Sequence, residues 1–165
     1  FVLPDAGRSE YGSGMNPGQR GGVRYDFAVY DSQGRLSALV DAMRRFGRDS
    51  SWAVAWHAMA MERMDQPANA NVVVIMPDRI YAWRPGAGAS AAPDWTLDAG
   101  PLLAPYFARL KIPVAEVHPH VFEEIVASWL RDAVQGEMSD GSIVEGAEGL
   151  LDALRGGEVV QQVAA

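Results

Sequence analysis

The sequence predicts a single α/β domain in which helices flank a mixed β-sheet. Its 165 residues suit one domain of ordinary size, and 48% of them are hydrophobic, which is enough for a substantial core. Segments with strand-like and helix-like patterns follow in the order strand, strand, helix, strand, strand and then several helices. Residues 71–76 contain an unbroken β-branched run, which is typical of an interior, parallel strand. Together these observations predict a mixed sheet covered by helices.

The first half of the domain begins with two predicted strands, at residues 25–30 and 36–43. The turn Asp31-Ser32-Gln33-Gly34 joins them as a hairpin. The second strand has little polarity on either face, so we expect it to be covered on both sides. A helix follows from residue 50 or 51 to about Met64, because apolar residues recur there at the spacing of one buried stripe. That stripe comprises Trp52, Ala55, Trp56, Met59 and Ala60.

The second half continues with a strand at 79–83, which we expect to pair as a hairpin with the run at 71–76. Residues 85–94 are rich in Gly, Ala, Ser and Pro and predict a loop. Three further helices are expected at about residues 101–110, 119–134 and 144–154. Gly156-Gly157 ends the last helix, and we expect a frayed tail after it.

We therefore divide the chain into three segments. Residues 1–24, which contain six glycines and two prolines, predict an extended N-terminal arm. Residues 25–135 form the predicted α/β core, and residues 136–165 hold the C-terminal helix and tail.

Composition limits the classes of function. The net charge is −7, with 21 acidic against 14 basic residues, which disfavours a protein that binds nucleic acid through phosphate neutralisation. The chain has no cysteine, which excludes disulfides and thiolate metal sites. No run approaches the roughly 18 apolar residues of a membrane span. We expect a cytoplasmic protein without a membrane span.

Three residues indicate a possible chemical function. Metal-dependent phosphodiester cleavage needs two carboxylates to hold a hard divalent cation and a lysine to assist the attacking water. An acid at the start of one strand and acid-x-lysine on the next would bring these groups together, because residues two apart on a strand share a face. The sequence has Asp26 and Asp41 at the two acid positions. Met43 stands where the lysine would be.

Several short stretches share their order and spacing with a known family. They are Tyr25–Arg35, Leu39–Met43, Met76–Trp83, Leu102–Tyr106 and Ile125–Leu130. This pattern resembles the core of the PD-(D/E)xK nuclease superfamily, and within it stand-alone bacterial domains related to the nuclease part of type I restriction subunits. The resemblance covers roughly residues 24–135 and implies a restriction-endonuclease-like fold with Asp26 and Asp41 at the metal-binding positions.

The departures from the family pattern lie where the chemistry would be. Methionine at position 43 has no donor and cannot activate water. The family often supplies a glutamine from the following helix, and the matching turn here holds Ala55 and Trp56. Tyr25 replaces the usual proline. The resemblance thus implies a degenerate active site, in which Asp26 and Asp41 are vestigial metal ligands.

No nearby basic residue is an obvious substitute for the missing lysine. Arg44 should point to the opposite face of the sheet, and Arg45 lies beyond the end of the strand. A guanidinium group also does not deprotonate in proteins, so neither arginine can serve as a base. Lys111, the only lysine, lies far along the chain.

We therefore expect a catalytically inactive, nuclease-like domain that acts as a protein-interaction or structural subunit, and not an enzyme. A protein partner or self-association is expected, and no cofactor. One alternative is a DNA endonuclease with a variant active site, which alone would require Mg²⁺. The other is a nucleic-acid-binding module that does not cleave, which the net charge disfavours.

The histidines and methionines give weaker indications of function than Asp26, Asp41 and Met43. His57 neighbours the buried stripe of its helix and is expected to be structural. His118 and His120 flank Pro119 at a predicted helix start, where cap or surface roles are expected rather than metal binding. The methionines after Trp56 indicate either core packing, which we favour, or an adaptable protein-contact surface. They are Met59, Met61 and Met64.

Overall fold

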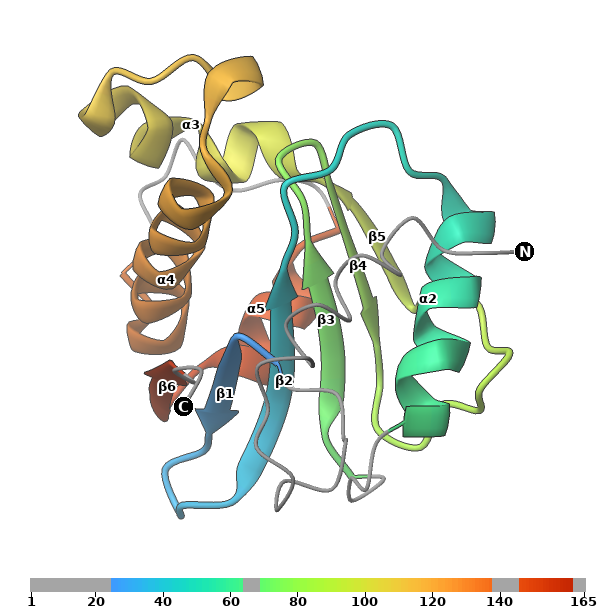
Figure 1. Ribbon diagram of the computed structural model, residues 1–165. Helices are drawn as coiled ribbons and strands as arrows, with labels where there is room; N and C mark the ends of the chain where they lie inside the picture. Colours follow the sequence, from blue (N-terminus) through green and yellow to red (C-terminus); the bar gives the residue numbers. More distant parts are fainter. Residues whose placement is uncertain (1–24, 64–68, 138–145, 162–165) are drawn as a thin grey trace, which may run out of the picture.

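A computed structural model describes residues 25–63, 69–137 and 146–161 (Figure 1). Within these ranges the chain forms a single mixed sheet of six strands with four α-helices. The strands are β1 (Phe27–Tyr30), β2 (Leu36–Ala42), β3 (Asn71–Ile75), β4 (Arg79–Trp83), β5 (Trp95–Asp98) and β6 (Glu158–Gln161). The helices are α2 (Ser50–Arg63), α3 (Ala99–Leu110), α4 (Pro119–Gln135) and α5 (Glu148–Leu154), with a 3-10 turn, η3, at Val114–Glu116.

The strand order is β5-β4-β3-β2-β1-β6. Helix α2 crosses from β2 to β3, and these two central strands are parallel. The other neighbouring pairs are antiparallel. The predicted parallel strand at 71–76 and the hairpin that follows it are therefore confirmed. The β-branched run of β3 is buried along its whole length, as expected for an interior strand.

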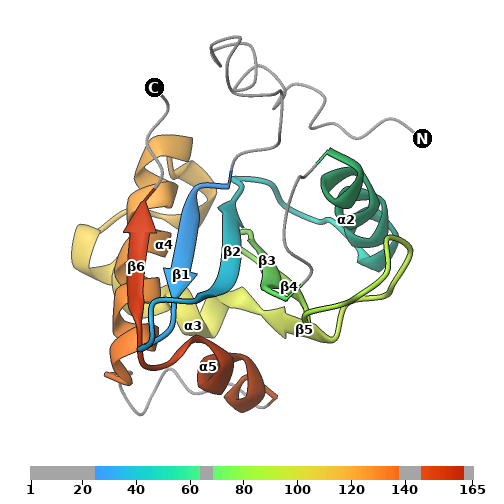
Figure 2. The ribbon, with the colours of Figure 1, turned by 90° about the horizontal axis from the view of Figure 1, so that it is seen from below.

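Helices cover both faces of the sheet. Figure 2 shows α3, α4 and α5 on one side and α2 on the other. The larger core lies under the three helices, and Phe122 and Trp129 of α4 are buried in it. The smaller core lies under α2, where Trp52 and Trp56 pack on the sheet. The β2 strand is buried on both faces, which confirms that prediction.

The C-terminal tail departs from expectation. Instead of fraying, residues 158–161 form β6 and pair with β1. A Cβ added to Gly157 would lie 1.4 Å from the carbonyl oxygen of Tyr30, so glycine permits this close approach. The contacts that hold β6 come from β1 and α4, more than 20 residues away in sequence, and local patterns do not report them. Residues 146–161 therefore share one sheet and one core with the described part of residues 25–135.

Some element boundaries also differ. Strand β5 was not predicted, because its four residues immediately follow the loop at 85–94 and run directly into α3. Helix α3 begins at Ala99 rather than residue 101, since the Asp98 side chain caps it by accepting a hydrogen bond from the Gly100 N–H (3.0 Å). The arm at 1–24 lies outside the described residues. Among the helices described, none has both the length and the apolar composition to cross a membrane.

Candidate functional site

The structure brings Asp26 and Asp41 to the same end of two neighbouring strands. Phe27 of β1 pairs with Val40 of β2, so Asp26, one residue earlier, lies across from Asp41, one residue later. The Asp26 Oδ2 atom accepts a hydrogen bond from the backbone N–H of Ala42 at 2.8 Å. The two acids that the sequence singled out are therefore neighbours.

Asp41 and Met43 point to the face of the sheet covered by α2. Leu39 and Met43 belong to the core under α2, whereas Val40 and Ala42 belong to the core on the opposite face. Because side chains alternate along a strand, Asp41 lies on the same face as Met43. Asp41 is 4% exposed and Met43 1% exposed. The position expected for a catalytic lysine is thus a fully buried part of the core.

Met43 is fixed by its backbone as well as its side chain. Its N–H donates to the carbonyl oxygen of Ile75 at 2.9 Å, which extends the β2–β3 pairing by one residue. Its thioether lies in the cluster that contains Trp52 and Trp56. A long, flexible methionine fills such irregular apolar spaces well.

A tyrosine completes the immediate surroundings of Asp41. Tyr25 is buried, and burial together with the negative charge of Asp41 raises the pKa of its phenol well above the ordinary value. The phenol therefore stays protonated at physiological pH. It contributes a neutral hydroxyl to the site, not a general base.

The aromatic side chains of α2 form a stacked group beside the site. Trp52 stacks on Trp56 with ring centroids 6.4 Å apart, and Trp56 lies 5.9 Å from Trp83 of β4. His57 stacks on Trp83 at 4.3 Å, nearly parallel to it. The turn of α2 that was matched to the family's glutamine therefore presents large rings to the sheet.

His57 is a buried structural residue, as expected. Its Nδ1 atom lies 3.4 Å from the carbonyl oxygen of Ala89. Burial lowers the pKa of the imidazole, although this carbonyl and the charge of Asp94 oppose the shift. The ring is therefore neutral at physiological pH. Its stacking on Trp83 could not be predicted from local patterns, because that contact joins a helix to a strand 26 residues later.

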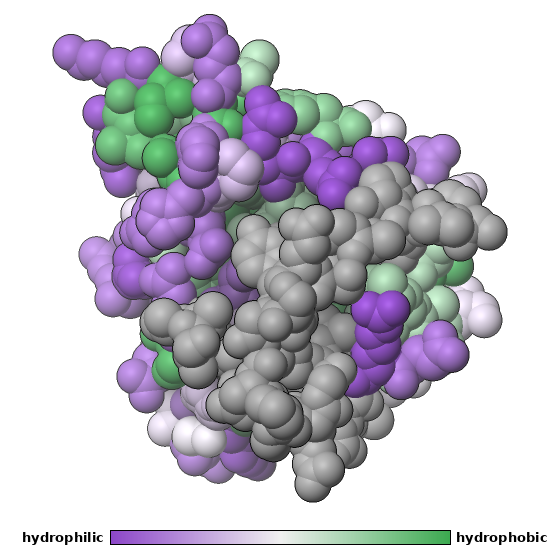
Figure 3. Space-filling model, viewed as in Figure 1, coloured by the Kyte–Doolittle hydropathy of each residue, from purple (hydrophilic) through white to green (hydrophobic). Residues whose placement is uncertain are grey.

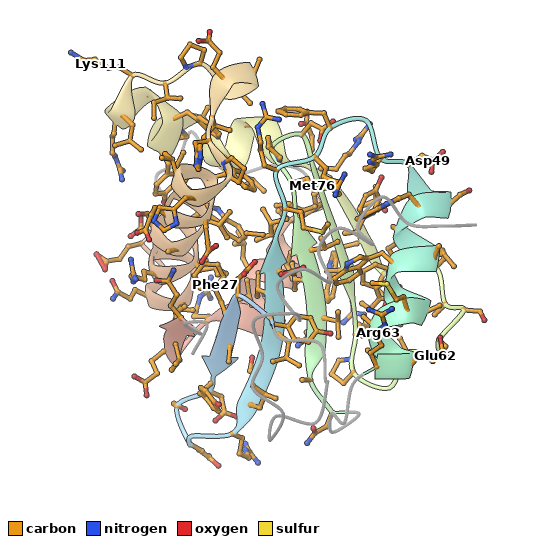
Figure 4. The ribbon with its side chains drawn as sticks, in the orientation of Figure 1. Phe27, Asp49, Glu62, Arg63, Met76 and Lys111 are labelled. Carbon is orange, nitrogen blue, oxygen red and sulfur yellow. The ribbon has the colours of Figure 1, made fainter. Side chains whose placement is uncertain are left out.

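Arg44 is turned away from the acids, which confirms the predicted orientation. Its Nε donates to the carbonyl oxygen of Val117 at 2.7 Å, and its Nη2 donates to that of Ala115 at 2.8 Å. Both acceptors lie on the other face of the sheet, between α3 and α4. Lys111 caps the C-terminus of α3 and lies far from Phe27, the residue that follows Asp26 (Figure 4). Neither residue takes the place of the missing lysine.

The candidate metal ligands are the two acids. Carboxylate oxygens suit a hard cation such as Mg²⁺. Among the residues that the structure describes, no group of three or more His, Asp or Glu side chains is arranged to hold a metal ion. His118 accepts a hydrogen bond from the His120 N–H (3.1 Å) and so caps α4, in agreement with the predicted cap role.

The fold and the site together define a single-sheet mixed α/β domain with a pair of acids at one end of the neighbouring strands β1 and β2. A third residue on the same face, Met43, is apolar and buried. Comparisons of the chain with protein-family models, curated proteins and solved structures found no match.

Proposed function

We propose that the chain is a nuclease-like domain of PD-(D/E)xK ancestry that no longer cleaves phosphodiesters and acts as a protein-binding subunit. The convergence of Asp26 and Asp41 supports the ancestry, since a metal-dependent nuclease needs two carboxylates at one place. The hairpin β1–β2, followed by the α2 crossover to a parallel β3, supports the restriction-endonuclease-like fold that the resemblance implies.

The burial of Met43 is the main observation that supports a loss of nuclease activity. An ammonium group at this position would have to lie in the core beneath Trp52 and Trp56. Burying a charge among apolar groups is unfavourable unless it is paired. The surroundings of Met43 have therefore adapted to a thioether, which neither donates a proton nor stabilises negative charge.

A protein partner, or a second copy of the chain, fits the surface better than a nucleic acid. The net charge of −7 opposes the approach of phosphates. Arg44, which lies next to the site in sequence, donates to two backbone carbonyls. Its donors at Nε and Nη2 are therefore engaged within the protein.

The direct test is nicking of supercoiled plasmid with Mg²⁺ or Mn²⁺, using the wild-type chain and Asp41→Asn. We expect no metal-dependent nicking by either protein. Nicking by the wild-type chain that Asp41→Asn abolishes would instead establish the second candidate, an endonuclease with a variant site and a Mg²⁺ cofactor. The convergence of the two acids is the observation that favours this second candidate.

The binding part of the proposal has a separate test. A tagged chain is purified from its native host under gentle conditions, and the mass of the native particle is measured. We expect a defined particle larger than the 17.8 kDa monomer. A monomer under all conditions would contradict a role as a subunit.

A further inference from the structure

Strand β6 forms one edge of the sheet. Among the described strands its one neighbour is β1, and Figure 2 shows β6 as the last strand on that side. Its pairing with β1 runs regularly from Glu158 to Gln161, without a bulge. The strand contains no proline and no lysine. Bulges, prolines and lysines are devices by which natural sheets prevent pairing at an edge, so nothing within β6 opposes a further strand.

The hydrogen bonds of β2 fix the direction of the backbone groups in β1. The Ala42 N–H points towards β1, because it donates to the Asp26 side chain. Backbone groups alternate in direction along a strand, so those of Val40 also point towards β1. Val40 is the partner of Phe27, and these two residues therefore bond to each other. The next residue, Ala28, has its N–H and C=O on the opposite side, towards β6.

The same alternation determines which backbone groups of β6 point outwards. Ala28 pairs with Val160, so the N–H and C=O of Val160 bond to β1. The N–H and C=O groups of Val159 and Gln161, one residue to either side, point away from the sheet. No strand of the described chain lies on that side. Donors and acceptors in this alternating order are complementary to another extended backbone.

The side chains of β6 divide between the two faces of the sheet. Val159 packs against the larger core, under α4. Val160 pairs with Ala28 of the smaller core, so it lies on the other face, where it is 43% exposed. Figure 3 shows apolar surface where Figure 1 places β6, beside hydrophilic side chains. An exposed apolar side chain therefore lies in the middle of the edge strand.

Charges of both signs surround this edge. Within the strand the one charged residue is Glu158, which is exposed. Glu123 of α4 accepts a hydrogen bond from the Gln161 side chain at 3.1 Å, and α4 also exposes Glu124 and Arg131. Because the signs are mixed, the edge favours a strand of low charge. Two ion pairs lie beside the start of β6, Arg35–Asp31 at 3.2 Å and Arg155–Asp152 at 3.3 Å.

A second copy of β6 meets these requirements. Two copies can pair antiparallel about a two-fold axis at Val160, which places Val159 of each chain opposite Gln161 of the other. The outward groups of these residues then exchange both hydrogen bonds. The two Val160 side chains cover each other on the exposed face. The two Glu158 side chains lie at opposite ends of the pair, roughly 14 Å apart, where salt screens their repulsion.

The opposite edge of the sheet, β5, is less suited to pairing. Pro93 and Asp94 precede this strand, and Asp98 at its end caps α3 with its side chain. Prolines and charges are typical of protected edges. Pairing of β6 with β5 of another copy would also generate an open filament, whereas pairing of β6 with β6 closes as a dimer.

We infer that β6 is a dimerisation edge, through which two copies of the chain join their sheets by antiparallel β6–β6 pairing. This inference rests on the proposed function as a subunit and names the partner as a second copy of the chain. A two-fold axis perpendicular to the sheet keeps each face on its own side. The dimer therefore has one continuous sheet with α4 of both copies on the same face.

The first test measures the mass of the purified chain by light scattering over a wide range of concentration. We expect the wild type to approach twice the 17.8 kDa of one chain as concentration rises. Val160→Lys brings two ammonium groups together at the two-fold axis and should weaken dimerisation at least about tenfold. The matched control is Val114→Lys, which changes another exposed valine, on η3, and should dimerise like the wild type. Circular dichroism and thermal melts check that the variants fold alike.

The second test is amide hydrogen exchange of the wild type, which needs no variant. In the dimer the N–H groups of Val159 and Gln161 bond to the other copy, whereas the Val160 N–H bonds to β1 in monomer and dimer alike. We expect the Val159 and Gln161 amides to exchange at least about tenfold more slowly in concentrated than in dilute protein. Exchange at Val160 should change less than at its two neighbours.

Two results would overturn the inference. One is a wild-type chain that stays monomeric at every concentration, and the other is a dimer in which the Val159 and Gln161 amides exchange as in the monomer. If the purified chain is monomeric but the particle from the native host contains a different protein, the inference fails and the proposed function stands. A monomer in both preparations would contradict the proposed function as well.

Discussion

The carboxylate of Asp26 accepts a hydrogen bond from the backbone N–H of Ala42, 2.8 Å away, and so ties the start of β1 to the end of β2. In a metal-dependent nuclease, the carboxylate at this place would direct its oxygens to a cation. Here one oxygen satisfies a backbone donor at the edge of the core. The acid therefore has a structural role that does not depend on catalysis.

Removing this acceptor should cost stability. We expect Asp26→Ala to lower the free energy of unfolding by about 1–3 kcal/mol, because it leaves the part-buried Ala42 N–H without its partner. Asp26→Asn keeps an oxygen acceptor and should cost less. Urea denaturation of the three proteins measures the difference. Equal stability of Asp26→Ala and the wild type would show that the hydrogen bond contributes nothing.

A lysine at position 43 should destabilise the protein. We expect Met43→Lys to lower the free energy of unfolding by about 3 kcal/mol, since it places an ammonium group in the core beneath Trp52 and Trp56. The charge of Asp41 on the same face offsets part of this cost. The control Met43→Leu conserves apolar volume and should change stability by less than about 1.5 kcal/mol. A Met43→Lys protein as stable as the wild type would mean that this position is not adapted to methionine.

The pairing of β6 with β1 depends on Gly157. We expect Gly157→Ala to lower the free energy of unfolding by about 1–3 kcal/mol, because the new methyl group would overlap the Tyr30 carbonyl and push β6 away from β1. Amide hydrogen exchange should accelerate in β1 and β6 more than in β3. Gly88→Ala is the control, since a Cβ at Gly88 meets no atom within 4 Å. Unchanged exchange in β6 would contradict the close approach.

His57 should make stability depend on pH in a defined direction. Burial lowers its pKa in the folded state below the usual value of 6.5, so the folded protein favours the neutral ring. Above pH 6.5 the ring is neutral in both states and the full stability is present. As pH falls below 6.5, the unfolded chain gains a proton before the folded protein does, and stability is lost down to the folded pKa.

The measurement is the difference in free energy of unfolding between the wild type and His57→Phe, taken from pH 7.5 to pH 5. Phenylalanine keeps an aromatic ring against Trp83 without a titrating group. Carboxylates titrate in both proteins, so the difference isolates His57. We expect the wild type to lose stability relative to His57→Phe as pH falls. A difference that is constant with pH would contradict the lowered pKa.

Local patterns in the sequence were sufficient to predict the central elements of the fold. The unbroken β-branched run at β3 and the apolar spacing in α2 are local signals, and both elements formed where they were expected. The hairpin order brought the segments of Asp26 and Asp41 together, but the turn alone did not set their register. A register shift between Val29 and Tyr30 places Asp41, rather than Val40, across from Asp26, and the sequence did not predict that irregularity.

The edge strands of the sheet and the contacts around the site were harder to predict from the sequence. Strands β5 and β6 have four residues each, and β6 is stabilised by β1 and α4, which are distant in sequence. The stacking of His57 on Trp83 and the bonds from Arg44 to Ala115 and Val117 also join remote segments. Such contacts depend on the assembled sheet, which local periodicity does not describe.

The most direct test of the loss of cleavage chemistry is a crystal structure of the protein soaked in Mn²⁺, with anomalous scattering recorded at the manganese edge. We expect the Met43 side chain to lie in the cluster with Trp52 and Trp56, and no manganese peak between the carboxylates of Asp26 and Asp41. A manganese ion bridging these two carboxylates, with an ordered water positioned to attack a phosphate, would contradict this expectation and point to an active metal-dependent site.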